Sequence, residues 1–164
     1  MARLDSSLEN AGAEFLVLGH LLIEKMQAFK AYTNFPGYDI IATNAEKNVS
    51  CRIQVKSRWA TDFDGGFLIK NFDCDFVVVV VLNRGYSKLK KSRSQDDTGR
   101  REPEFYVIPV EIVKAARYEK SSWGKVFLRH IEQVEQYLGN WDLIRQFLGG
   151  EETQIDAERT MDMD

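Results

Sequence analysis

The stretch YDIIATNAEKNVSCRIQVKSR, residues 38–58, decides how the rest of the sequence is interpreted. Its second half, residues 49–58, alternates apolar with polar residues, which is the period of a half-buried β-strand. Gln54 and Lys56 therefore share one face of that strand. The first half predicts a short apolar strand opened by Asp39, and a hairpin through the polar residues between the halves would set the two strands side by side. One carboxylate, one amide and one amine then converge.

A helix is predicted upstream, from Ser6 to Lys30. Ser6 and Glu9 match a capping box, which marks the start of a helix. Glu14 falls within or at the border of its apolar face, so its carboxylate needs a cation, a donor or a metal ion, unless it reaches solvent at the edge. The residues expected to form the buried stripe recur at helical spacing: Leu8, Ala11, Phe15, Leu18, Leu22, Met26 and Phe29.

Two glycines, Gly12 and Gly19, interrupt this predicted helix. Each weakens a helix by about 1 kcal/mol compared with alanine. Their presence predicts that another backbone comes close to the helix at these points.

The three elements together resemble a known enzyme family. A glutamate on an N-terminal helix, an aspartate at the head of a strand, and a hairpin into a strand that reads (D/E/Q)-x-K resemble the PD-(D/E)XK, or restriction-endonuclease-like, nuclease superfamily. The matching positions here are Glu14, Asp39 and Gln54-Val55-Lys56. Gln54 stands where most of the superfamily has an acid. This QxK form is similar to that of bacterial intron-encoded homing endonucleases.

The resemblance implies an α/β fold, with a single domain built on a central mixed β-sheet flanked by helices. It also implies hydrolysis of phosphodiester bonds with Mg²⁺, or Mn²⁺ as a substitute, and DNA as the partner. Asp39 would bind the metal ion directly, together with Glu14 and the backbone carbonyl of Val55. Gln54 would offer its amide oxygen, and Lys56 would position or deprotonate the attacking water. The expected catalytic residues are therefore Glu14, Asp39, Gln54 and Lys56.

Length and charge divide the chain into a domain and a tail. The chain has 164 residues and is 44% hydrophobic, which is enough for one domain with a real core. We expect residues 1–149 to form the domain and residues 150–164 to form an acidic, disordered tail. The tail carries six acids against one arginine, so its net charge is −5. Since the whole chain has a net charge of −3, residues 1–149 have a net charge of +2. It is either a solvated end or a competitor with nucleic acid for a basic surface.

Several other classes of protein are disfavoured. No apolar run approaches the roughly 20 residues needed to cross a bilayer, and the N-terminus lacks the pattern of a signal peptide. Cys51 and Cys74 have no metal-ligand spacing and are expected to be reduced, as in a cytoplasmic protein. With His20 and His130 as the two histidines, a zinc or histidine-metal nuclease is disfavoured.

A run of five valines within residues 76–82 predicts a strand buried on both faces, at the centre of the sheet. A parallel neighbour would need a crossover helix, and the sequence between Lys56 and Phe76 has no helical pattern. Pro109 favours a strand end or an edge strand. Other elements are predicted from local pattern: strands at 67–70 and 105–110, a helix at 111–118, and helical spacing over 127–138 and 141–148.

Residues 84–101 form a polar segment with seven basic residues against Asp96 and Asp97. The segment is either a phosphate-contacting loop, with Tyr86 available to stack on a base or sugar, or a surface excursion between two strands. In the first case, the expected nucleic-acid-binding residues are Arg58, Lys88, Lys90, Lys91 and Arg93.

Three functions remain open at this level. A DNA endonuclease is favoured, because Glu14, Asp39 and Lys56 occur together. A catalytically inactive nuclease-fold module that binds nucleic acid or a protein partner is the second, and Gln54 is the main argument for it. The third is an interaction protein that uses the C-terminal helices, whose apolar residues fit either the core or a homo-oligomer contact.

Overall fold

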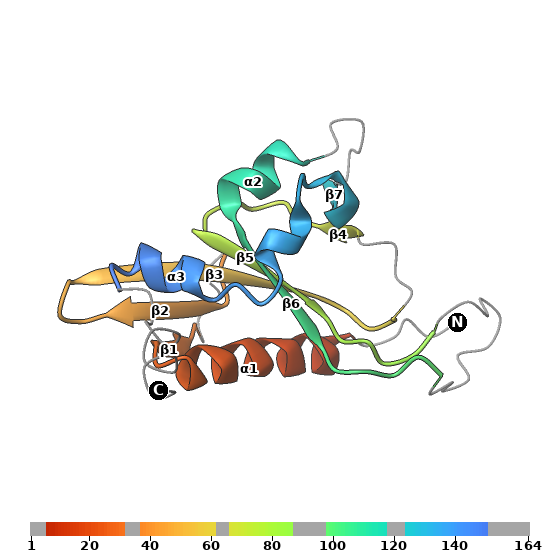
Figure 1. Cartoon of the computed structure of the whole chain (residues 1–164), viewed down its shortest axis with the longest axis horizontal. Helices are drawn as coiled ribbons and strands as arrows, with labels where there is room; N and C mark the ends of the chain where they lie inside the picture. Colours follow the sequence, from red (N-terminus) through yellow and green to blue (C-terminus); the bar gives the residue numbers. More distant parts are fainter. Residues whose placement is uncertain (1–5, 32–36, 62–65, 87–97, 118–123, 151–164) are drawn as a thin grey trace, which may run out of the picture.

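The computed structural model describes residues 6–31, 37–61, 66–86, 98–117 and 124–150 (Figure 1). Strands β1, β2, β3, β5 and β6 form a five-stranded sheet in that order, and β4 pairs with β7 in a separate two-stranded sheet. The elements are α1 (Ser7–Ile23), β1 (Gln27–Lys30), β2 (Ile40–Asn44), β3 (Val49–Arg58), β4 (Gly66–Leu68), β5 (Phe76–Val81), β6 (Glu104–Pro109), α2 (Val110–Ala115), β7 (Lys125–Phe127), the 3₁₀ turns η1 (Leu128–His130) and η2 (Val134–Tyr137), and α3 (Asp142–Phe147).

The predicted single α/β domain with a mixed sheet is confirmed. The hairpin of β2 and β3 is antiparallel, with Ile40 opposite Ile53. Strand β5, the valine run, pairs parallel with β3 and antiparallel with β6, and every one of its residues is buried. It is therefore an inner strand covered on both faces, as its sequence indicates. Pro109 ends β6, the edge strand, where its missing N–H leaves no gap in the ladder.

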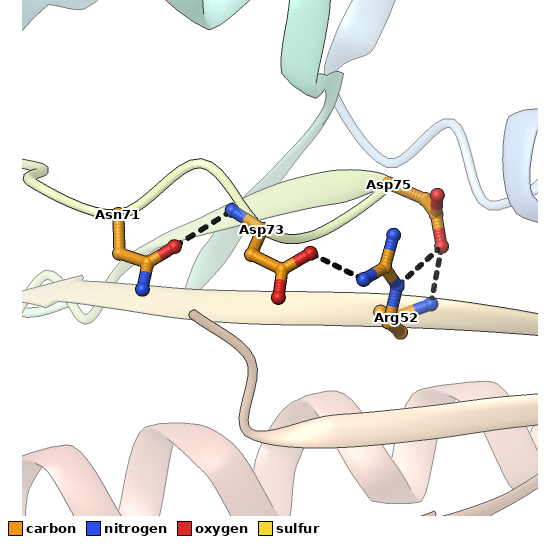
Figure 2. A network of polar contacts seen from close by, with 4 residues as sticks. All are labelled: Arg52, Asn71, Asp73 and Asp75. Atoms are coloured by element: carbon orange, nitrogen blue, oxygen red, sulfur yellow. Dashed lines mark hydrogen bonds and ion pairs between the residues drawn. The ribbon is translucent and has the colours of Figure 1, made fainter. Parts of the chain in front are cut away.

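The parallel pairing of β3 with β5 is made without a crossover helix in the described residues, so the expectation that it needs one was wrong. A polar network holds the incoming chain instead (Figure 2). Asp75 accepts a hydrogen bond from the Arg52 N–H at 2.7 Å, and its own N–H donates to the Arg52 carbonyl at 2.8 Å. The Arg52 guanidinium contacts both Asp73 and Asp75, and Asn71 accepts from the Asp73 N–H. These contacts fix the start of β5 against β3.

Each face of the sheet has its own core. Helix α1 packs below the sheet in Figure 1 and buries Ala13, Val17 and Leu21 against the face that carries Ile53 and Val78. The opposite face is covered by α2, the small β4–β7 sheet and the 3₁₀ turns. Since Gln54 and Lys56 alternate with Ile53 along β3, they belong to the face opposite α1.

The predicted N-terminal helix was drawn too long. It ends at Ile23, and residues 27–30 form strand β1. Lys25 takes a left-handed conformation (φ 65°), and the N–H groups of Lys25 and Met26 donate to the carbonyls of Leu22 and Leu21. These two hydrogen bonds form a Schellman cap. The left-handed residue of such a cap is usually glycine, which makes it recognisable in a sequence, but here it is Lys25. The predicted capping box is also not formed, since the Ser6 side chain makes no capping hydrogen bond.

The predicted buried stripe was wrong in part: Leu18 packs against the core and Met26, beyond the end of α1, is buried as predicted, but other members are not. Leu8, Phe15 and Leu22 lie on the exposed side. The helix instead buries Ala13, Val17 and Leu21 against the sheet. The helix is apolar around most of its circumference, so periodicity alone cannot choose the inner face. No atom of another segment lies within 4 Å of a Cβ placed at Gly12 or Gly19. None of the described segments therefore supplies the close backbone predicted there.

The C-terminal segment is less helical than predicted. Residues 127–138 form the end of β7 and two 3₁₀ turns rather than a helix, while α3 matches the second predicted stretch. Trp141, Ile144 and Leu148 are buried in the chain's own core, with Trp141 stacked on the His20 ring at 5.3 Å. Most apolar side chains here thus complete the domain.

Two further expectations concern the ends and the membrane. Residues 151–164, nearly all of the predicted tail, lie outside the described residues, so the tail stays a prediction. None of the helices in the described segments has the length and apolarity that spanning a membrane requires.

Candidate active site

Asp39 lies directly before β2, at the point where β2 stops covering β3. Its backbone N–H donates to the Ile53 carbonyl, and its carboxylate Oδ2 accepts a hydrogen bond from the Val55 N–H at 2.8 Å. The side chain thus continues the ladder that β2 leaves unfinished. The N–H and carbonyl of one residue point to the same edge of a strand, so the Val55 carbonyl points toward the edge that Asp39 occupies.

Gln54 and Lys56 lie on β3 beside this carboxylate. Extending the β2–β3 register by one residue sets Asp39 opposite Gln54. Both side chains are half-buried, and the Gln54 amide oxygen Oε1 is buried with no hydrogen-bond partner. Leaving a buried acceptor unpaired costs about 1–3 kcal/mol, so this atom is poised for a donor or a cation. Within the described segments, the side-chain amine of Lys56 makes no hydrogen bond or ion pair.

Glu14 lies on α1, across the sheet from Gln54 and Lys56, and is near enough to Asp39 to raise the pKa of that carboxyl. Its carboxylate forms an ion pair of 2.8 Å with Lys30 of β1, and the Lys30 ammonium lies 4.4 Å from the centre of the Phe15 ring. The cation that a half-buried Glu14 requires is therefore Lys30. The sequence prediction missed this lysine because it placed residue 30 in the helix. Its position beside Asp39 follows from β1 pairing with β2, where Lys30 is opposite Ile40.

The surroundings of Asp39 and Lys56 shift the pKa values of these two groups in opposite directions. Burial raises the pKa of Asp39 above its ordinary value, and Glu14 raises it further, against the hydrogen bond from Val55 and the charges of Lys56 and Lys30. Burial also lowers the pKa of Lys56, although the Asp39 carboxylate opposes this effect. Each group is thus held nearer to its neutral form, which is the pattern of residues that exchange protons or bind a cation.

The donor set at this end of the sheet fits a divalent metal ion with few protein ligands. No group of three or more His, Cys, Asp or Glu side chains suited to a metal occurs in the part of the chain that the structure describes. Mg²⁺, however, commonly binds through one or two carboxylates and keeps several waters. Asp39, the unpartnered Gln54 Oε1 and the Val55 carbonyl would supply such a set, with Glu14 behind them.

Arginine and aromatic side chains gather at the C-terminal end of β3, where Arg58 and Arg84 are half-buried and Arg100 and Arg101 are exposed. Backbone hydrogen bonds join the segments that carry them: the Arg84 N–H donates to the Trp59 carbonyl at 2.9 Å, and the Tyr86 N–H donates to the Thr98 carbonyl at 3.0 Å. Trp59 and Tyr86 are 52% and 44% exposed. We call this surface the arginine–aromatic end, formed by Arg58, Trp59, Arg84, Tyr86, Arg100 and Arg101.

The predicted nucleic-acid-binding residues have different outcomes. Arg58 belongs to this end, and its Nε also donates to the Gly66 carbonyl at 2.6 Å, which fixes its stem. Lys88, Lys90, Lys91 and Arg93 lie outside the described residues, so their role stays a prediction. Trp59 was not among the residues predicted from the sequence to bind nucleic acid.

Comparison with solved structures decides the fold. A bacterial homing endonuclease, I-Ssp6803I, superposes with a TM-score of 0.54 at 19% identity, over 88% of this chain and 94% of the other. The chain has the restriction-endonuclease-like fold. A Holliday junction resolvase, Hjc, from the archaeal hyperthermophile Archaeoglobus fulgidus, matches with a TM-score of 0.45 at 15% identity, over 88% and 98% of the two chains. No protein-family model and no curated protein matches the sequence.

Proposed function

We propose that this protein is a metal-dependent endonuclease that hydrolyses phosphodiester bonds in DNA. The observation that carries the proposal is the meeting of Asp39, the unpartnered Gln54 oxygen and the half-buried Lys56 at one end of the sheet. The homing endonuclease with the same fold supports the reaction class.

The side chains have separate roles in this reaction. Asp39 holds Mg²⁺ or Mn²⁺, with the Val55 carbonyl and Gln54 as neutral partners and Glu14 in support. When bound, the metal ion offsets charge on the scissile phosphate and promotes attack by water. Lys56 Nζ contacts that phosphate and takes or orients the proton of the attacking water, a task that a lowered pKa favours.

A plasmid assay tests the proposal. Supercoiled DNA is incubated with the purified full chain and Mg²⁺, Mn²⁺ or EDTA, and the nicked and linear forms are measured. We expect cleavage with either metal ion and none with EDTA. Binding of DNA with no cleavage under any of these conditions would contradict the proposal.

Gln54→Met is expected to raise the Mg²⁺ concentration needed for half-maximal cleavage by about 10-fold, because it removes the amide oxygen and keeps the length of the side chain. Its melting temperature should not fall, since the buried unpaired oxygen is replaced by an apolar group. Gln54→Glu should lower the same half-maximal concentration by adding a carboxylate. Equal metal requirements for wild type and both variants would remove Gln54 from the site.

The arginine–aromatic end gives a separate test of the substrate. Trp59→Ala and Tyr86→Ala should each weaken binding of a single-stranded oligonucleotide by about 1–3 kcal/mol, the usual loss of one base–aromatic stack. Leu138→Ala is the matched control, because Leu138 is exposed to the same 44% as Tyr86 but lies by η2. Fluorescence anisotropy measures the three affinities. If all three equal that of wild type, DNA does not contact this end.

One observation favours a second function, a nuclease-fold module that binds nucleic acid or a protein partner without cleaving. Glutamine at position 54 leaves the site with two carboxylates, Glu14 and Asp39, and without the third that an acid at this position would add. In that case DNA binding measured by fluorescence anisotropy would not depend on Mg²⁺. In the plasmid assay, Gln54→Glu would be the variant that gains cleavage.

A further inference from the structure

The outer side of α1 is an apolar surface to which the helix itself contributes no charged residue, and the Lys30 ammonium that lies against Phe15 is paired with Glu14. Leu8, Phe15 and Ile23 on this side are 82%, 55% and 72% exposed. At about 100° per residue, one outward arc collects Leu8, Ala11, Gly12, Phe15, Leu16, Gly19, Leu22 and Ile23. A helix face that meets water usually carries charged residues, and this one carries none.

The glycines of α1 lie on the same side. Among the described residues, no atom lies within 4 Å of an added Cβ at Gly12 or Gly19, so packing against these segments does not require glycine. Glycine costs a helix about 1 kcal/mol relative to alanine, which makes two such residues in one helix hard to explain by a single chain. Small residues do let a second helix approach closely.

The spacing of these residues is symmetric about the middle of the helix. Counting outward from the bond between Phe15 and Leu16, Gly12 is matched by Gly19 and Leu8 by Ile23. Two copies of α1 can pack antiparallel about a two-fold axis at this point. Gly12 of one copy would then lie opposite Gly19 of the other, and Leu8 opposite Ile23. Such self-matching is the requirement for an isologous dimer interface.

We propose that this protein forms a homodimer in which the outer sides of two α1 helices pack antiparallel, with Phe15 and Leu16 at the two-fold axis. Aromatic side chains bury roughly 150–250 Å² each. The exposed apolar residues of α1 therefore supply a large part of the ~800 Å² that each partner of a stable complex buries. The dimer does not depend on nuclease activity.

Other occupants of this surface fit less well. Helices that lie on membranes carry lysine and arginine on their polar face, and α1 contains neither residue. The C-terminal tail has six acids and few large apolar residues, so it matches an uncharged apolar surface poorly. A second copy of α1 satisfies both the apolar character and the symmetry.

Sedimentation velocity of the full chain over a wide concentration range tests the dimer. Wild type should show a monomer–dimer equilibrium, and Gly12→Leu or Gly19→Leu should raise the dissociation constant by about 30-fold or more. Neither variant should melt lower as a monomer, because leucine favours helix over glycine and the added atoms meet open space. Glu111→Leu, an exposed position on α2, is the control and should leave the dimer unchanged. A wild type that stays monomeric at every concentration overturns the proposal.

Cysteine cross-linking tests the antiparallel register. A mixture of Leu8→Cys chains with Ile23→Cys chains should form a disulfide dimer, because these positions face each other; native Cys51 and Cys74 are buried. Leu8→Cys alone should not cross-link, since two copies of residue 8 would be about 22 Å apart at 1.5 Å per residue. Cross-linking of Leu8→Cys with itself would show a parallel pair and contradict the antiparallel arrangement.

Discussion

Asp39→Asn is expected to abolish metal-dependent cleavage while the protein remains at least as stable as wild type at neutral pH. Removing the carboxylate takes away the direct metal ligand, and losses of about 100–1,000-fold are typical when one charge-stabilising group is lost. Asparagine keeps an oxygen that can accept the hydrogen bond from the Val55 N–H, so the end of the β2–β3 ladder is preserved.

The stability of this variant should differ from wild type in a pH-dependent way. The pKa of Asp39 is raised in the folded protein, so between 3.8 and that raised value the folded state holds more protons than the unfolded state. The contribution of Asp39 to stability therefore falls as the pH rises through this range, and Asp39→Asn removes that fall. Melting temperatures of both proteins, measured from below pH 3.8 to neutrality, should diverge in favour of the variant.

Asp75→Asn is the matched control, because it makes the same chemical change at the start of a neighbouring strand. Asp75 binds the backbone and guanidinium of Arg52 (Figure 2), so its loss of charge should lower the melting temperature and leave cleavage per folded molecule unchanged. If Asp39→Asn instead destabilised the fold as Asp75→Asn does and kept its activity, Asp39 would be a structural residue.

The hairpin and the valine strand could be predicted from sequence because their patterns leave few alternatives. Ten residues of period-two alternation fix which face of β3 carries Gln54 and Lys56, and an unbroken apolar run fits an inner strand. The predicted convergence of Asp39 with these side chains followed from the hairpin alone. Local sequence pattern was sufficient for these features because each depends on a single hairpin or strand.

The inner side of α1 and the place of Lys30 could not be predicted in the same way. A helix that is apolar nearly all round offers two candidate stripes, and the choice between them is made by the sheet. The stop at Ile23 depends on a left-handed Lys25, a position where glycine is the usual signal. With the helix drawn to residue 30, the strand that brings Lys30 to Glu14 was hidden.

Lys56→Met is expected to reduce cleavage by about 100–10,000-fold, the usual contribution of a positioned acid or base. Burial lowers the pKa of Lys56 in the folded protein, so between that value and 10.5 the folded state holds fewer protons than the unfolded state. The contribution of Lys56 to stability therefore rises with pH through this range, and at neutral pH the charged amine opposes folding. Lys56→Met should consequently melt higher than wild type at neutral pH while being inactive.

Lys30→Met is the contrasting variant, since the Lys30 amine pairs with Glu14 at 2.8 Å and its loss leaves a half-buried carboxylate without its cation. That variant should melt lower than wild type. Lys56→Arg separates the two roles of Lys56, because arginine keeps the positive charge but does not deprotonate. If Lys56 takes a proton from water, the wild-type rate should rise with pH and level off below 10.5, and Lys56→Arg should be as inactive as Lys56→Met. An active Lys56→Arg would mean that Lys56 acts on the phosphate through its charge alone.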